Sequence, residues 1–401
     1  CNLAANCIGG MYLAAMMIDL GVSDALISVI VSFSTFAGLA MGFSPYIAAK
    51  LKRVKLFILL GCGIQLIPWS LLFFLPILGA TASSAALIGS VYLICCIVGN
   101  IITPSYSELR EAVAQDSGHP ERFYGLKEAI GNICIVIAFL ITTIIYKQWD
   151  GERAYIAYTI AGCVGVAAGI ARLIFLMGVT VPKMEPVKHP GSFFRIIRDM
   201  FTCKQFRPYL IYGVFITIGG AFVSGIDTIF FVDKMGLSVS FISLMLMLGV
   251  IGRAFFAPVW GRVAEKIGIS RSLSIAVFIT AFCYLVNFFT NPGNAVVFRV
   301  IANAIALFGC SGTGVLATPF IYRCTPVEYH YQFVSFINVV AMAISYPLTL
   351  LVSLCVKLWG GWTATFLGNE ISLMHILYLF TTACYIGVSV YLLNIKDRKL
   401  A

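Results

Sequence analysis

The stretch GRVAEKIGISR, at residues 261–271, concentrates charge between two long apolar runs. A similar stretch, PYIAAKLKRVK at residues 45–55, stands 216 positions earlier and is also flanked by apolar runs. Both contain Ala-x-Lys followed by an aliphatic residue, and both end on a basic residue. Only the later stretch has an acid, Glu265, where the earlier one has Ala49. The pair therefore indicates one loop present twice, with the acid kept in one copy.

The apolar runs around both stretches are long enough to cross a lipid bilayer. Hydrophobic residues make up 60% of the 401-residue chain and charged residues only 11%, with a mean hydropathy of +0.96. A soluble domain is about 25% charged, and about 20 apolar residues cross a hydrocarbon core of roughly 30 Å as a helix. Twelve such runs stand at about 1–19, 25–49, 56–79, 84–106, 124–146, 154–180, 208–231, 239–260, 271–290, 295–319, 332–357 and 371–394. The composition predicts an integral membrane protein, whose first helix we expect to start before Cys1.

The basic residues are distributed unevenly between the two sets of loops. With an even number of spans and both ends on the same side, 20 of the 27 Lys and Arg residues fall in loops on that side and 4 on the other. Cytoplasmic loops of membrane proteins carry such an excess. We therefore expect a multi-pass protein of the cell (inner or plasma) membrane, with both termini in the cytoplasm. The net charge of +10 then reflects topology, and no nucleic-acid partner is expected.

The longest polar stretch, residues 182–207, lies midway along the chain. Its proline and charge content indicates a cytoplasmic linker between two halves, 1–181 and 208–401. Within it, Ser192 could cap a short helix that carries apolar side chains and bases, namely Phe193, Ile196, Ile197 and Met200 with Arg195 and Arg198. This pattern predicts a helix on the inner membrane surface with its basic face toward the lipid headgroups. The alternative is a merely solvated linker.

The two halves repeat at several further places. GNIITP (99–104) and GVLATP (314–319) share Gly-x-x-x-Thr-Pro, and LGVSDALISVI (20–30) resembles MGLSVSFISLM (235–245). Asn132 and Asn338 also correspond. Repeats in the same order at nearly one spacing indicate a duplicated six-helix unit. The fold class predicted is an all-α polytopic membrane protein with 12 transmembrane helices in two pseudo-symmetric six-helix bundles, and a cavity at the midplane between them.

At these residues the chain resembles the major facilitator superfamily, over essentially its whole length. The family's loop pattern, Gly-x-x-x-Asp-Arg-x-Gly followed by a base, is matched in the second half by Gly261, Glu265, Lys266, Gly268 and Arg271. Glu replaces the usual Asp, and the first half has Ala49 and Lys52 at the acid and second glycine positions. The resemblance implies the family's fold, alternating access, and a conformational latch at this loop. Glu265 would favour the inward-closed state, while the first-half loop would contribute mainly topological positive charge.

Other family signatures are missing. The antiporter signature built on Gly-Pro is absent from the fifth helix, which reads YGLKEAIGNICIV (124–136). The arginine often found in the fourth helix is replaced by Tyr92, and by Leu307 in the second half. These departures disfavour the proton-linked drug exporters. The opening LGVSD…KLKRVK resembles a bacterial branch of the family.

Ionisable groups inside predicted spans are candidates for transport and coupling, since each is costly in hydrocarbon. Asp227 and Arg299 lie at similar depth near one surface and could form an ion pair, or Asp227 could be a protonation site. Two separate charges that reach water are the alternative. Glu128 and Arg253 could pair across the two halves, unless Lys127 pairs with Glu128 instead. Arg172 can reach the surface with its long side chain.

The uncharged repeated positions allow two interpretations each. Asn132 and Asn338 could bind substrate or form hydrogen bonds between helices. Gly99, Pro104, Gly314 and Pro319 are interpreted as packing and kink positions.

The remaining sequence gives no indication of enzymatic chemistry. The 13 cysteines form no Cys-x-x-Cys, the four histidines are scattered, and no GxxxxGK[ST] or HExxH occurs. We expect no metal and no cofactor. The function predicted is secondary active transport of a small solute, coupled to protons, by a monomer that contacts membrane lipids. A facilitated uniporter and a non-transporting sensor or receptor are the alternatives.

Overall fold

The computed structural model describes residues 10–22, 26–27, 30, 33–34, 36–51, 54–79, 81–148, 154–179, 192–224, 227, 230–237, 239–359, 361–366 and 369–395. Residues 1–9 of the first predicted span, Lys52 and the linker residues 182–191 lie outside this part. The chain forms two compact units. The first unit comprises residues 1–116, 134–196 and 331–342, and the second comprises residues 117–133, 197–330 and 343–401.

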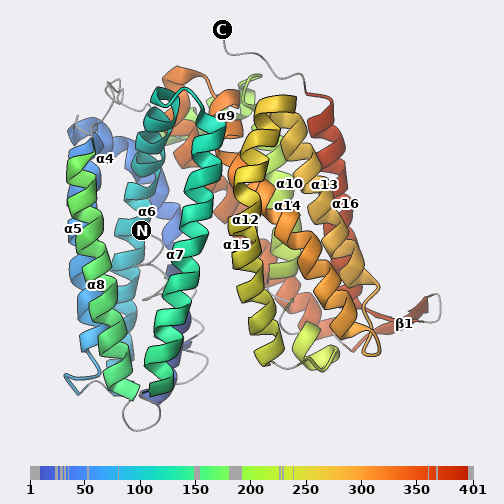
Figure 1. Cartoon of the computed structure of the whole chain (residues 1–401), viewed down its shortest axis with the longest axis horizontal. Coiled ribbons are helices and arrows are strands. Elements are labelled where there is room, and N and C mark those ends of the chain that lie inside the picture. Colours follow the sequence, from blue (N-terminus) through green and yellow to red (C-terminus); the bar gives the residue numbers. More distant parts are fainter. Residues whose placement is uncertain are drawn as a thin grey trace. The chain divides into compact units, whose positions relative to one another are not determined.

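The first unit is a bundle of apolar helices (Figure 1). Its elements are α2 (Gly10–Asp19), the 3-10 helix η1 (Ala37–Phe43), α4 (Ser44–Leu51), α5 (Val54–Phe74), η2 (Ala82–Ser84), α6 (Ala85–Asp116), the later part of α7 (Pro120–Gln148) and α8 (Ala154–Gly178). Helix α5 lies between α6 and α8. A Cβ on Gly162 would lie 2.4 Å from Phe73 Cβ, so this glycine lets α8 approach α5 closely.

The second unit contains the remaining helices. These are α9 (Phe193–Thr202), whose first residues belong to the first unit, then α10 (Arg207–Ser224), the π-helical turn η4 (Phe230–Lys234), α12 (Val239–Ile267), α13 (Ile269–Phe288), α14 (Ala295–Cys324), η5 (Val327–Tyr329), α15 (His330–Trp359) and α16 (Leu373–Leu393). The second unit also includes the start of α7, whereas residues 331–342 of α15 belong to the first unit. Helix α13 packs against both α14 and α16. Gly309 makes this possible, because a Cβ there would lie 2.8 Å from the backbone nitrogen of Thr280.

Each of the twelve predicted spans overlaps a helix in the described part of the chain. By length and hydropathy alone, six described helices could cross a membrane, or seven if the bent pair α9–α10 is one span. Several helices continue past the apolar runs: α6 extends to Asp116, α12 to Ile267 and α14 to Cys324. These helices extend beyond the predicted spans, because charged residues end an apolar run without ending a helix.

A short β-hairpin precedes α16 and was not predicted. Strand β1 (Thr363–Phe366) pairs antiparallel with β2 (Asn369–Ser372), with Thr363 opposite Ser372. Ser372 begins α16 with a reciprocal cap, in which the backbone N–H of Ser372 donates to His375 Nδ1 at 3.0 Å. His375 Nε2 lies 2.9 Å from the carbonyl oxygen of Thr290. The hairpin is therefore anchored to the bundle through His375.

Candidate transport and gating sites

Asp227 and Arg299 form an ion pair inside the second unit. Arg299 Nη2 lies 3.0 Å from Asp227 Oδ2, and Nη1 lies 3.4 Å from Oδ1. The phenol of Tyr378, on α16, donates to Oδ1 at 2.7 Å. The Arg299 guanidinium also stacks on the Phe231 ring, 4.1 Å from its centroid. The pairing expected from sequence is confirmed, and the carboxylate receives a third donor from Tyr378.

This cluster is largely removed from solvent. The side chains of Arg299 and Asp227 are 10% and 29% exposed, and Tyr378 is fully buried. A buried ion pair is stable only when both partners are present and their hydrogen bonds are satisfied. Within the described residues, the Nε of Arg299 is the one buried side-chain nitrogen or oxygen of this cluster without a partner. Three donors on Asp227 thus hold a carboxylate where an unpaired one would be costly. A role in proton coupling remains a prediction.

Tyr378 and Phe231 were not predicted from the sequence. With 18 tyrosines and 31 phenylalanines in the chain, residue type alone does not single out these two. The first unit has a similar contact near the start of its last helix. There Tyr158, on α8, donates to Asp19 of α2 at 2.5 Å.

The expected pair of Glu128 and Arg253 is absent from the described residues. Glu128 instead lies 2.8 Å from Lys127 Nζ, the local partner that the sequence left open. Its carboxylate faces α14, because a Cβ on Gly314 would lie 3.7 Å from Glu128 Oε1. Arg253, on α12, donates from Nε to the carbonyl oxygen of Gly249 at 3.3 Å. The prediction is wrong because two side chains at the same depth in the membrane can point in different directions around their helices.

The matched asparagines adopt the same local arrangement. Asn132 Nδ2 donates to the carbonyl oxygen of Glu128 at 2.9 Å, and Asn338 Nδ2 donates to that of Val334 at 2.7 Å. Each bond joins a residue to the one four positions earlier in the same helix. A substrate contact through either side chain stays a prediction.

The repeated Gly-x-x-x-Thr-Pro segments lie inside continuous helices. Pro104 lies within α6 and Pro319 within α14, and both helices continue beyond them. A Cβ on Gly99 would lie 2.5 Å from Gln65 Nε2, which donates to the carbonyl oxygen of Cys95 at 3.2 Å. Gly99 therefore allows α5 to approach α6 closely. Gly314, on α14, differs, because a Cβ there would meet Glu128 of α7 only at an ordinary contact distance of 3.7 Å.

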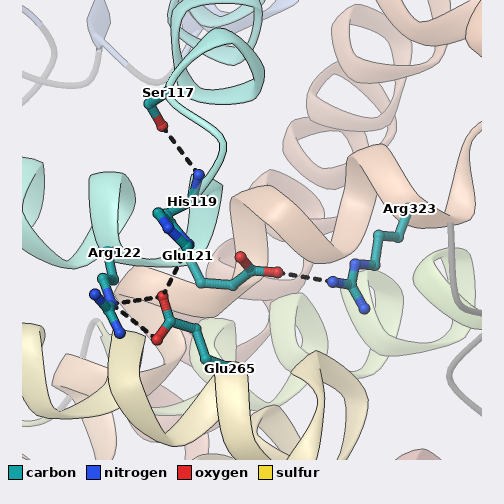
Figure 2. A network of polar contacts seen from close by, with 6 residues as sticks. All are labelled: Ser117, His119, Glu121, Arg122, Glu265 and Arg323. Atoms are coloured by element: carbon teal, nitrogen blue, oxygen red, sulfur yellow. Dashed lines mark hydrogen bonds and ion pairs between the residues drawn. The ribbon is translucent and has the colours of Figure 1, made fainter.

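Glu265, from the stretch GRVAEKIGISR, belongs to a polar network within the second unit (Figure 2). Arg122 Nε lies 2.7 Å from Glu265 Oε1 and donates to Oε2 at 2.8 Å. His119 Nδ1 lies 3.9 Å from the same carboxylate. Beside it, Arg323 Nη2 donates to Glu121 at 2.7 Å. The start of α7 thus forms ion pairs with both α12 and α14.

Gly261 and Gly125 bring the backbones of α12 and α7 together. A Cβ on Gly261 would lie 2.9 Å from the carbonyl oxygen of Glu121, and one on Gly125 would lie 3.0 Å from that of Ala257. The two close contacts lie about one helical turn apart along each helix. Small residues permit such close packing between membrane helices.

The turn after α12 is made by another glycine of the motif. Gly261 is helical, since α12 continues to Ile267, whereas Gly268 has φ +90° and precedes α13. A positive φ is readily adopted only by glycine. Lys266 and Arg271 are exposed on either side of this turn. The latch role of the five motif residues stays a prediction.

The first copy of the loop has a different structure. Lys55 Nζ donates to the carbonyl oxygens of Met177 and Val179, at 2.8 and 2.7 Å, at the end of α8. These are carbonyls that a helix end leaves without partners in its own helix, and they attract a cation. The expectation that this loop contributes mainly topological charge is therefore wrong for Lys55.

A buried hydroxyl cluster lies near that loop in the first unit. Tyr331, at the start of α15, hydrogen-bonds through its phenol oxygen to Ser44 Oγ at 2.7 Å and to Ser105 Oγ. Both serines are fully buried. In the sequence repeat, Ser44 corresponds to Trp260, Ser105 to Phe320, and Tyr331 to Gly125. Trp260 and Phe320 are each 1% exposed.

At these corresponding positions, a small residue in one unit therefore matches a large residue in the other. In the first unit, two small serines receive the large Tyr331 from the start of α15. In the second unit, Trp260 and Phe320 are large, and Gly125 at the start of α7 is small. The first unit thus holds the start of α15 through buried hydroxyls, whereas in the second unit the start of α7 pairs with the acid Glu265.

Helices arranged in this way, with buried charges and two related units, define a multi-pass membrane protein of the solute-transporter type. The family model of the Major Facilitator Superfamily matches residues 2–345, and the chain belongs to this family. The family is one of transporters and is not enzymatic. Among curated proteins none matches the sequence.

Solved structures confirm the fold. A bacterial homologue of the iron transporter ferroportin, in an outward-facing state, has a TM-score of 0.65 at 12% identity, with 98% of each chain covered. A variant of the Escherichia coli fucose:proton symporter FucP has a TM-score of 0.64 at 12% identity, covering 96% of this chain and 97% of that one. The proton:xylose symporter XylE has 0.67 at 11% identity, covering 97% and 92%. At these identities the likeness shows the fold alone.

Proposed function

We propose that this protein is a secondary active transporter that moves a small solute by alternating access and is coupled to protons. The partly buried carboxylate of Asp227 carries the coupling, because protonation would remove the charge that Arg299 and Tyr378 hold. Two proteins of the same fold are by name proton symporters, of fucose and of xylose. The few charges within the helices favour a neutral, zwitterionic or amphipathic solute over a polyanion.

In the proposed cycle, a role falls to two short helix segments. Each belongs to the unit formed mainly by the other half of the sequence. Residues 117–133 of α7 belong to the second unit, and residues 331–342 of α15 belong to the first. With the termini in the cytoplasm, as the distribution of bases favours, both segments lie on the cytoplasmic side. Their contacts, through Glu265 and through Tyr331, would hold that side shut and would separate when it opens. Contacts made in only one state bias the equilibrium toward it.

The proposal is tested in proteoliposomes that hold the purified protein and a pool of metabolites. Mass spectrometry of the solutes gained or lost, with and without an inward proton gradient, identifies those that the protein moves. We expect gradient-driven accumulation of one solute. The Asp227→Asn variant should lose accumulation but retain exchange of the same solute, because exchange needs no net proton movement. Flux that ignores the gradient would show a uniporter, and binding without flux would show a sensor.

The latch at Glu265 is tested by amide hydrogen exchange of residues 117–133. Glu265→Gln should raise their exchange by up to about fivefold, because a partly exposed ion pair contributes about 0.2–1 kcal/mol. Arg262→Gln is the matched control, since Arg262 is exposed on the same helix and is not one of the five motif residues. Equal protection in wild type and the Glu265 variant would exclude an ionic latch.

A further inference from the structure

Helix α9 has a defined orientation relative to the helix that follows it. The axes of α9 and α10 differ by 102° across the break at residues 203–206. Phe206 is fully buried in this break, and its backbone N–H donates to the carbonyl oxygen of Cys203. In a multi-pass protein the apolar α10 runs through the bilayer. A helix at about a right angle to its end therefore lies along the membrane surface.

One face of α9 is already covered by the protein. Ile196 and Met200, one turn apart, are 5% and 0% exposed. The Phe193 ring contacts Phe336, with centroids 5.0 Å apart. Both belong to the apolar side chains that the sequence placed on this helix, and both are buried. Their burial fixes which side of the helix remains outside.

The outer side combines aromatic and basic side chains. Phe194 and Phe201 are 79% and 51% exposed, and the side chain of Arg198 is 72% exposed. At about 100° per residue these three lie within about 60° of one another on the helix. Lys204 and Arg207 are exposed just beyond the helix end. Exposed phenylalanines beside bases are typical of helices that lie in the lipid interface.

We propose that this outer side of α9 binds the headgroups of anionic phospholipids. Phe194 and Phe201 would enter the boundary between headgroups and acyl chains, while Arg198, Lys204 and Arg207 would contact phosphate oxygens. The charge of the segment fits this partner, since Asp199 is its one acid, 3.6 Å from Arg198. The inference requires only a multi-pass membrane protein, so it holds equally for a transporter or a sensor.

Photocrosslinking of the full-length protein in liposomes tests the proposal. Benzoylphenylalanine replaces Phe194 or Phe201, and the liposomes contain phosphatidylcholine with 0 or about 30% phosphatidylglycerol. Intact-mass spectrometry then counts the lipid adducts. We expect phosphatidylglycerol adducts in about fivefold excess over its share of the bilayer, the preference that one basic residue near a charged surface provides. Arg198→Gln should reduce this excess without reducing the total lipid adducts.

Phe255 provides the matched control. It is 75% exposed within α12, at the level of an apolar span, so the same label there should give lipid adducts without preference for phosphatidylglycerol. Lipid adducts at 255 but none at 194 or 201 would overturn the proposal. So would adducts to a soluble protein in native membranes, or a phosphatidylglycerol excess that Arg198→Gln leaves unchanged.

Discussion

Replacing Arg299 by leucine is expected to destabilise the second unit by about 3–5 kcal/mol, the usual cost of removing one partner of a buried ion pair. The change leaves the carboxylate of Asp227 with Tyr378 as its one remaining partner among the contacts described above, and it removes the cation that stacks on Phe231. In a thermal unfolding experiment in detergent micelles, the apparent Tm should fall on the order of 10 °C, at about 2–4 °C per kcal/mol for units of this size.

The double variant Asp227→Leu, Arg299→Leu is the control. Replacing both charges by apolar groups of similar volume is often neutral, because the desolvation cost of the pair is removed with its attraction. The double variant should therefore unfold at a higher temperature than Arg299→Leu alone. If it is as unstable as the single variant, the loss comes from packing around the guanidinium and the ion pair is not its cause.

The Asp227–Arg299 pair could be predicted from sequence because few charges lie within the spans. Arg299 has few possible partners at its depth, so scarcity itself identified Asp227. Glu128 shows the limit of that reasoning: it had both Arg253 and the adjacent Lys127 within reach. Choosing between them requires the direction of each side chain around its helix. That direction depends on how the helices pack: the Glu128 carboxylate lies beside Gly314 of α14.

The loop motif shows a second limit. The sequence identified Gly261 and Glu265 as parts of the loop motif. It did not identify Arg122 and His119 as partners, because both lie before the apolar run in which the fifth span was predicted to begin. The correspondence of the large Tyr331 with the small Gly125 could be found in the sequence. The repeat of Asn132 and Asn338 sets the alignment in which these two residues correspond.

The steric contact at Gly261 should matter more than the ionic one beside it. In Gly261→Ala the new Cβ would lie 2.9 Å from the Glu121 carbonyl oxygen and 3.5 Å from Arg122 Cα. Backbone atoms cannot rotate away as a side chain can, so the start of α7 has to move. Overpacking of this kind costs about 1–3 kcal/mol. Amide exchange of residues 117–133 should therefore rise about tenfold, above the change expected for Glu265→Gln.

Two further variants separate displacement of α7 from a general effect of removing a glycine. Gly220→Ala, in α10, adds a Cβ with nothing within 4 Å, so it should leave exchange of 117–133 unchanged and raise helix stability by up to about 1 kcal/mol. Gly125→Ala meets the Ala257 carbonyl oxygen from the opposite helix at 3.0 Å, and it should reproduce the effect of Gly261→Ala. If Gly261→Ala behaves like Gly220→Ala, the two backbones are not in contact. The hold on α7 would then have to come from its ion pairs with Glu265 and Arg323, and Glu265→Gln would become the larger of the two changes.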